Sequence, residues 1–102
     1  MPLKKPNHQI TPTEKLFLYA LYQQKGSVSE IIQRIINASG SYISPSISAY
    51  YPTLTKLEEK KLISSKSEKQ KRRVTVFSIT KSGKNVVKFF REVDQALLEN
   101  NH

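Results

Sequence analysis

Five of the chain's lysine and arginine residues lie within eight consecutive positions, where the only acid is Glu68. These cations are Lys66, Lys69, Lys71, Arg72 and Arg73. A cation that neutralises a phosphate releases a condensed counterion, so such a cluster is typical of a surface that contacts a nucleic-acid backbone. Adjacent arginines also suit a minor groove, where the electrostatic potential is most negative. The cluster therefore predicts a site for an anionic polymer.

The remaining charge supports the same interpretation. The 102 residues carry a formal net charge of +9, and residues 66–85 hold +6 of it. Two further cations, Lys4 and Lys5, lie in residues 1–10, which we expect to form a flexible basic arm that contacts DNA. Such a surplus makes an anionic partner more probable than a neutral one.

Residues that could support catalysis or hold a metal are scarce. The chain has no cysteine, and its two histidines are His8 and His102. Tyr50 and Tyr51 could suggest a strand-nicking nucleophile, but that chemistry needs a metal cluster or a basic constellation around the phosphate, and no central histidine is available. We therefore expect no enzymatic activity, no catalytic residue, no cofactor and no metal. No apolar run approaches the roughly 18 residues of a membrane span, so we expect a cytoplasmic protein without a membrane partner.

The elements that position the basic cluster are predicted by capping signals and hydrophobic periodicity. Residues 11–14 and 27–30 each form a capping box that begins a helix, and Gly26 is placed to cap the end of the first. A third helix begins between residues 45 and 48, with the later start favoured because it leaves Pro52 in the first turn. Residues 62–66 and 74–79 read as two strands, and Thr80 caps a last helix. The expected order is helix, helix, helix, strand, strand, helix.

Two segments resemble a known family. Residues 51–63, Tyr-Pro-Thr-Leu-Thr-Lys-Leu-Glu-Glu-Lys-Lys-Leu-Ile, resemble the recognition-helix segment of PadR-like regulators, and residues 77–84, Phe-Ser-Ile-Thr-Lys-Ser-Gly-Lys, resemble their exit from strand to helix. The resemblance implies a mainly α fold with a β-hairpin (α+β), the winged helix-turn-helix. The domain would cover residues 11–99, with the wing at about 63–79 and the C-terminal helix at about 81–99. Lys61 stands where the family usually has a glycine, and the C-terminal arm is shortened to one helix.

The third helix would then be the recognition helix. Its predicted DNA contacts are Ser46, Ser48, Tyr50, Thr53 and Lys56. Only Lys56 belongs to the residue types that make bidentate base contacts. We therefore expect the wing, helped by the basic arm, to carry most of the affinity for double-stranded DNA. The alternative is that the serine- and threonine-rich helix dominates from the major groove.

The last helix carries an apolar stripe that is too wide for one small core. Its members are Phe89, Phe90, Val93 and Leu97. Part of this stripe should cover the first helix, and we assign the remainder to a homodimer interface, because two-fold dimers are the commonest soluble oligomers. A monomer in which the first helix covers the whole stripe is the alternative.

Two biological roles fit a non-enzymatic protein that binds double-stranded DNA. No ligand pocket is evident and the C-terminal region is short, which favours an accessory protein that marks an origin of transfer or replication on a mobile element. Relaxosome or other plasmid-transfer proteins would then be its partners. The length and lysine content are also similar to those of accessory winged-helix proteins of Gram-positive conjugative plasmids. The alternatives are a PadR-like transcriptional regulator at an operator, and a winged helix that binds an acidic protein.

Overall fold

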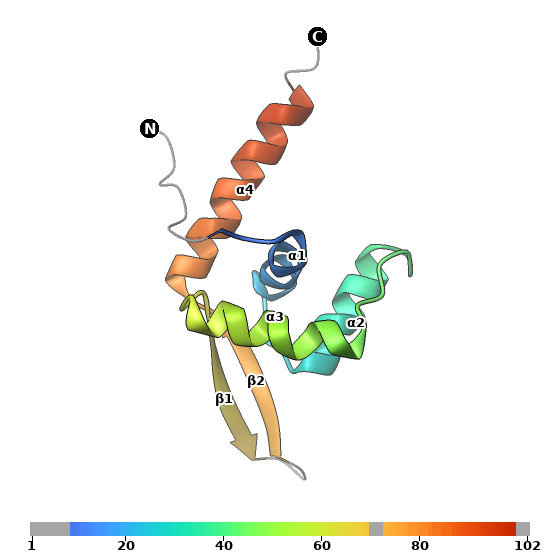
Figure 1. Ribbon diagram of the computed structural model, residues 1–102, viewed down its shortest axis with the longest axis vertical. Coiled ribbons are helices and arrows are strands. Elements are labelled where there is room, and N and C mark those ends of the chain that lie inside the picture. The colour runs from blue at the N-terminus through green and yellow to red at the C-terminus, as the bar shows by residue number, and fades with distance from the viewer. Residues whose placement is uncertain (1–8, 70–72, 100–102) are drawn as a thin grey trace.

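The computed structural model describes residues 9–69 and 73–99 of the chain (Figure 1). Its elements are α1 (Pro12–Leu21), α2 (Val28–Ala38), α3 (Ile47–Glu59), β1 (Ile63–Lys69), β2 (Arg73–Ile79) and α4 (Lys81–Glu99). The strands form an antiparallel hairpin. The predicted α+β fold and its element order are therefore confirmed. None of the described helices is long and apolar enough to span a bilayer.

Helix α1 is the centre of the molecule. It contacts α2, α3, α4 and β2, and its residues Phe17, Leu18 and Leu21 are at most 1% exposed. In Figure 1, α3 crosses in front of α1, while the hairpin and α4 extend from the helical body in opposite directions. Contacts with these four elements thus bury the nearly continuous apolar sequence of α1. The hairpin is left free to project from the body.

Both predicted capping boxes are present. Thr11 Oγ1 accepts from the Glu14 amide at 3.1 Å, and Glu14 Oε1 accepts from the Thr11 amide at 2.8 Å. Ser27 and Glu30 repeat the arrangement at 3.3 and 2.9 Å. These reciprocal bonds satisfy amide groups that a helix N-terminus otherwise leaves without partners.

The predicted role of Gly26 is wrong. Helix α1 ends at Leu21 and is capped by Tyr22, well before the glycine. Gly26 is buried and pairs with Phe77 of β2: its amide donates to the Phe77 carbonyl at 3.0 Å and its carbonyl accepts from the Phe77 amide at 2.8 Å. The conformation of Gly26 therefore depends on its pairing with Phe77 of β2 and not on the end of α1.

The start of the third helix lies within the predicted range of residues 45–48, but the predicted place of Pro52 is wrong. Helix α3 begins at Ile47, which places Pro52 inside it rather than in its first turn. Proline has no amide hydrogen to donate to the carbonyl of Ser48, but Ser48 is exposed, so water can serve that carbonyl. Burial of Leu54 and Leu57, at 2% and 0% exposure, holds the helix together across this gap.

Lys61 takes over the role of the glycine that usually ends this helix. Its φ of +60° lies in the left-handed region, which costs a lysine more than a glycine. The Lys61 amide donates to the Glu58 carbonyl at 2.9 Å, and the Leu62 amide donates to the Leu57 carbonyl at 3.0 Å. These two bonds form a Schellman motif, so the turn keeps its usual geometry despite the missing glycine.

Gly83 in the first turn of α4 allows this helix to approach the base of the hairpin. The Thr80 hydroxyl accepts from its amide at 3.1 Å and thereby caps the helix as predicted. A Cβ on Gly83 would overlap the Leu62 carbonyl oxygen and lie 2.6 Å from Ile79 Cγ1. The Leu62 carbonyl belongs to the backbone, so a change of side-chain rotamer cannot relieve this overlap.

We therefore expect Gly83→Ala to destabilise the fold by about 1–3 kcal/mol, because overpacking outweighs the better helix propensity of alanine. Urea denaturation of both proteins measures the change. Ser82→Ala is the matched control, since Ser82 is exposed in the same turn and should tolerate the methyl group. Equal stability of Gly83→Ala and the unsubstituted protein would contradict the packing described here.

Candidate nucleic-acid interface

The hairpin carries three of the predicted basic residues, from its middle to its last described pair. The strand register runs from the pair Ile63–Ile79 at the base to the pair Lys69–Arg73 at the far end. Lys66 is exposed on β1, opposite Val76. The predictions for Lys71 and Arg72 concern residues 70–72, which lie outside the described part of the chain. Of the five predicted wing cations, the structure thus assigns Lys66, Lys69 and Arg73 to the strands of one projecting hairpin.

The base of the hairpin is fixed to the body by apolar side chains. Ile63 and Phe77 are 3% and 7% exposed and belong to the core. Further along the hairpin, Lys25 Nζ lies 3.2 Å from Glu68 Oε1. The single acid of the basic cluster therefore contacts the loop between α1 and α2. Sequence reasoning did not find Lys25, because its partner is 43 residues away and no local pattern links them.

The exposed face of α3 differs from the predicted one at two positions. Ser48 and Lys56 are exposed, as is Ser46 just before the helix, whereas Thr53 is only 8% exposed. Tyr50 is half-buried against the core, and the neighbouring Tyr51 is 65% exposed instead. The buried stripe of Tyr50, Leu54 and Leu57 sets the rotation of the helix. Thr53 and Tyr50 are thus less exposed than predicted, whereas Tyr51 and Thr55 present exposed hydroxyls; DNA contact by the predicted residues of α3 stays a prediction.

Gln9, the first described residue, lies beside the C-terminal end of α3. Lys4 and Lys5 lie outside the described residues, so their predicted contacts have no structural counterpart. Directly after the arm, the Gln9 carbonyl accepts from Lys60 Nζ at 2.7 Å. The same ammonium group lies 2.9 Å from both carboxylate oxygens of Glu14. Lys60 thus links Gln9 and α1 to the C-terminal end of α3.

The sequence model of the PadR-like family of transcriptional regulators matches residues 17–88, which is more than half of the chain. The chain belongs to this family. No curated protein sequence matches it significantly. The resemblance of residues 51–84 is thereby confirmed at the level of the family.

Solved structures support the fold of this PadR-like chain. A PadR-like transcription factor from Bacteroides fragilis is 20% identical over 85% of this chain and 84% of its own, with a TM-score of 0.75. A PadR family regulator from Clostridium difficile R20291 is 17% identical over 87% and 93%, with a TM-score of 0.76. Bacillus subtilis PadR in complex with operator DNA is 22% identical over 81% of this chain and 48% of its own, with a TM-score of 0.71. None of these three is described as a plasmid-transfer protein.

In this PadR-like chain, part of the apolar stripe of α4 packs against the core and part is exposed to solvent. Val86 and Val87 are buried, and Phe90 is half-buried against the core of its own protomer. Phe89 lies edge-on to Phe90, with ring centroids 5.5 Å apart. Val93 is half-buried, whereas Leu97 is 71% exposed. Of the predicted interface residues, Phe90 therefore packs largely against the core of its own chain, whereas Leu97 is exposed to solvent.

An ionic cluster fixes α4 on α1. Lys15 Nζ lies 2.8 Å from Asp94 Oδ2 and 5.2 Å from the centroid of the Phe90 ring. The Tyr19 hydroxyl lies 3.4 Å from the same carboxylate oxygen, and burial together with the Asp94 charge raises the pKa of this tyrosine. The contacts end at Asp94, so the last turns of α4 extend beyond the body, as Figure 1 shows.

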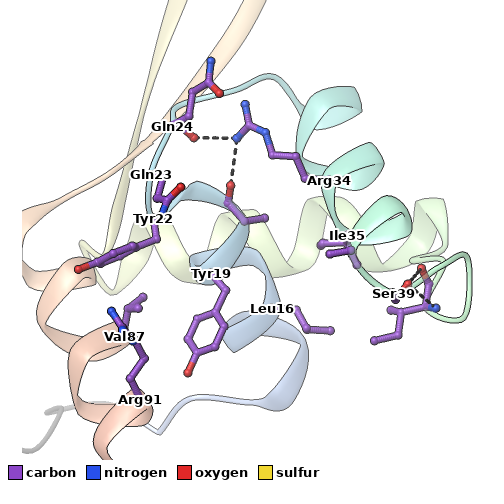
Figure 2. Close-up of a pocket in the computed structure, with 13 residues that line it drawn as sticks. Leu16, Tyr19, Tyr22, Gln23, Gln24, Arg34, Ile35, Ser39, Val87 and Arg91 are labelled. Atoms are coloured by element: carbon purple, nitrogen blue, oxygen red, sulfur yellow. Dashed lines mark hydrogen bonds between the residues drawn. The ribbon is translucent and has the colours of Figure 1, made fainter.

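An open groove of about 840 Å³ lies between α1, α2 and α4 (Figure 2). Its lining combines apolar and aromatic side chains with two arginines, Arg34 and Arg91, and includes no acid. Sequence reasoning expected no ligand pocket. Periodicity within single helices could not reveal this groove, because its walls come from three segments far apart in the chain.

Proposed function

We propose that this PadR-like chain is a transcriptional regulator that binds double-stranded operator DNA through its wing and α3. The observation that carries the proposal is a hairpin that projects from the body next to α3 and carries Lys66, Lys69 and Arg73 on its strands. In winged helices these two elements present one surface to a duplex. A family member of the same fold has been solved with operator DNA.

Within this surface the wing supplies most of the affinity. The exposed part of α3 offers the hydroxyls of Ser48, Tyr51 and Thr55 and one cation, Lys56. Glu58 faces the base of β1, where its carboxylate accepts from the Ser65 hydroxyl at 2.9 Å. Hydroxyl groups contact phosphates or discriminate bases weakly, whereas lysine and arginine release counterions. Lys4 and Lys5 of the arm would extend the same electrostatic contact.

The regulator role replaces the accessory role at an origin of transfer as the first choice. The family match and the solved complex of a family member with operator DNA support the regulator, whereas the accessory role depended on the absence of an evident pocket and on the short C-terminal region. Selection of bound fragments from sheared genomic DNA, followed by footprinting, tests the choice. Enrichment of promoter segments supports the regulator, and enrichment of a transfer origin contradicts it. A protein-interaction module would bind no duplex even at low salt.

We also propose that the functional unit is a homodimer formed by the outer half of α4. Leu97 and Leu98 are 71% and 76% exposed, and Phe89 and Val93 are half-buried beside them. A two-fold contact would bury this surface twice, once from each protomer. Burial of one leucine contributes on the order of 1.5–3 kcal/mol. An aspartate within such an interface would therefore oppose association from both sides.

Leu97→Asp is expected to convert the dimer to a monomer at micromolar concentration, as measured by light scattering coupled to size exclusion. Gln95→Asp is the matched control, since Gln95 is exposed on the same part of α4 but outside the apolar stripe. It adds the same charge and should leave the dimer intact. A monomeric unsubstituted protein would contradict the dimer without affecting the DNA-binding proposal.

A further inference from the structure

Arg34 of α2 binds the backbone of the loop between α1 and α2. Its Nη1 donates to the Ala20 carbonyl at 3.0 Å and to the Gln24 carbonyl at 2.7 Å, and its Nη2 donates to the Lys25 carbonyl at 2.8 Å. Figure 2 shows the guanidinium between the end of α1 and the loop. One side chain thus satisfies three carbonyl groups that the end of α1 and the following turn leave without helical partners.

The same loop is bound to the wing on its other side. Gly26 follows Lys25 directly and makes the two backbone bonds with Phe77 of β2. Lys25 itself contacts Glu68 of β1 through its side chain. The loop is therefore joined to the hairpin by one β-bridge to β2 and one ion pair to β1. A two-stranded hairpin alone is only marginally stable, so the pairing with the loop helps to fix the direction in which the hairpin projects from the body.

Gly26 and Arg34 are in direct contact. A Cβ on Gly26 would lie 2.9 Å from Arg34 Nη2 and 3.2 Å from Cζ, so the guanidinium packs against the glycine backbone. The φ of Gly26 is not in the left-handed region, and an alanine could therefore adopt its backbone conformation. Its methyl group would instead displace the end of the Arg34 side chain. Substitution of either residue should thus disturb the same contact.

We propose that Arg34 is a positioning residue for DNA binding, which holds the loop against β2 and thereby fixes the direction in which the wing meets the duplex. The proposal depends on the proposed function. Arg34 need not touch DNA: it reduces the number of wing orientations that must be ordered on binding. The planar fork of arginine is required, because a lysine ammonium cannot satisfy three carbonyls in this arrangement.

Arg34→Lys tests the proposal, since it keeps the charge and removes the fork. We expect affinity for an operator duplex to fall about five- to tenfold. Gly26→Ala should cause a similar loss. Arg91→Lys is the matched control, because Arg91 is exposed on α4 and makes no contact with the loop or the wing among those described. Unchanged affinity in Arg34→Lys would overturn the proposal.

A combined substitution separates positioning from general destabilisation. In a background with Lys71, Arg72 and Arg73 replaced by alanine, Arg34→Lys should cost little further affinity, because the wing it positions no longer binds. An undiminished loss in that background would contradict a role through the wing.

Amide hydrogen exchange provides a readout that does not involve DNA. In Arg34→Lys, the amides of Gly26 and Phe77 should lose protection, while that of Leu18 in the core keeps it. Full protection of Gly26 and Phe77 would overturn the proposal. If the unsubstituted protein bound no duplex at low salt, the proposed function would fail, and exchange would still decide whether Arg34 holds the wing.

Discussion

Replacement of Lys71, Arg72 and Arg73 by alanine is expected to weaken binding of the operator duplex on the order of a hundredfold near physiological salt. Each lysine or arginine that contacts a phosphate releases condensed counterions. The favourable free energy of this release is lost when alanine replaces the cation. The slope of log affinity against log salt should therefore become shallower by about 0.9 for each contact removed. Fluorescence anisotropy over a range of salt concentrations measures both quantities.

Two matched variants show whether position or charge causes this loss. Alanine at Lys84, Lys88 and Arg91 removes three cations from the exposed surface of α4 and should change the affinity much less. Alanine at Ser48, Tyr51 and Thr55 tests α3 and should relax sequence preference more than it lowers affinity. If the α3 variant proved the more damaging for affinity, the recognition helix would dominate, and the assignment to the wing would be wrong.

Elements that depend on neighbouring residues were predictable from the sequence. The Thr11 and Ser27 capping boxes each need only a residue three positions away, and both form. The β-branched run of β2 and the cap at Thr80 likewise carry their signal locally. The role of Gly26 has no such local signal, because a glycine after a helix usually marks the end of that helix. Only its pairing with Phe77, which lies 51 positions away, reveals its role.

The third helix shows how rotation about the helix axis decides which side chains are exposed. Successive residues of a helix point about 100° apart, so the choice between Tyr50 and Tyr51 as the core residue decides which side chains face DNA. Pro52 favoured a later start, but burial of Leu54 and Leu57 outweighs one missing hydrogen bond. Thr53 then turns inward with Tyr50. Lys25 and the groove were missed for another reason, because both depend on contacts between distant segments.

Glu14→Gln is expected to lower the free energy of unfolding by about 2–3 kcal/mol, or the melting temperature by roughly 10–20 °C. Glu14 is 2% exposed, and its carboxylate lies 2.9 Å from Lys60 Nζ. The glutamine can still accept from the Thr11 amide, so the capping box survives while the ion pair is lost. Lys60 is 20% exposed, and the cost is therefore smaller than for a fully buried pair.

The loss should depend on pH. Burial alone would raise the pKa of Glu14, but hydrogen bonds from Lys60 and Thr11, together with the Lys60 charge, bring it below the ordinary value. The folded protein thus holds this carboxylate ionised at pH values where the unfolded chain begins to bind a proton. Its contribution to stability is complete above the ordinary pKa and disappears as the pH falls through the lowered one. Urea denaturation at a series of pH values should show the two proteins converging in acid.

Glu30→Gln isolates the ion pair as the cause. Glu30 occupies the same position in the Ser27 capping box, where its hydrogen bonds with Ser27 lower its pKa, but its side chain is exposed. Its replacement removes one exposed charge near a helix N-terminus, worth about 0.3–1 kcal/mol. A comparable loss from both substitutions would mean that the negative charge near the helix N-terminus, and not the contact with Lys60, makes Glu14 important. A clearly larger loss at Glu14 assigns the difference to the contact that joins α1 to the end of α3.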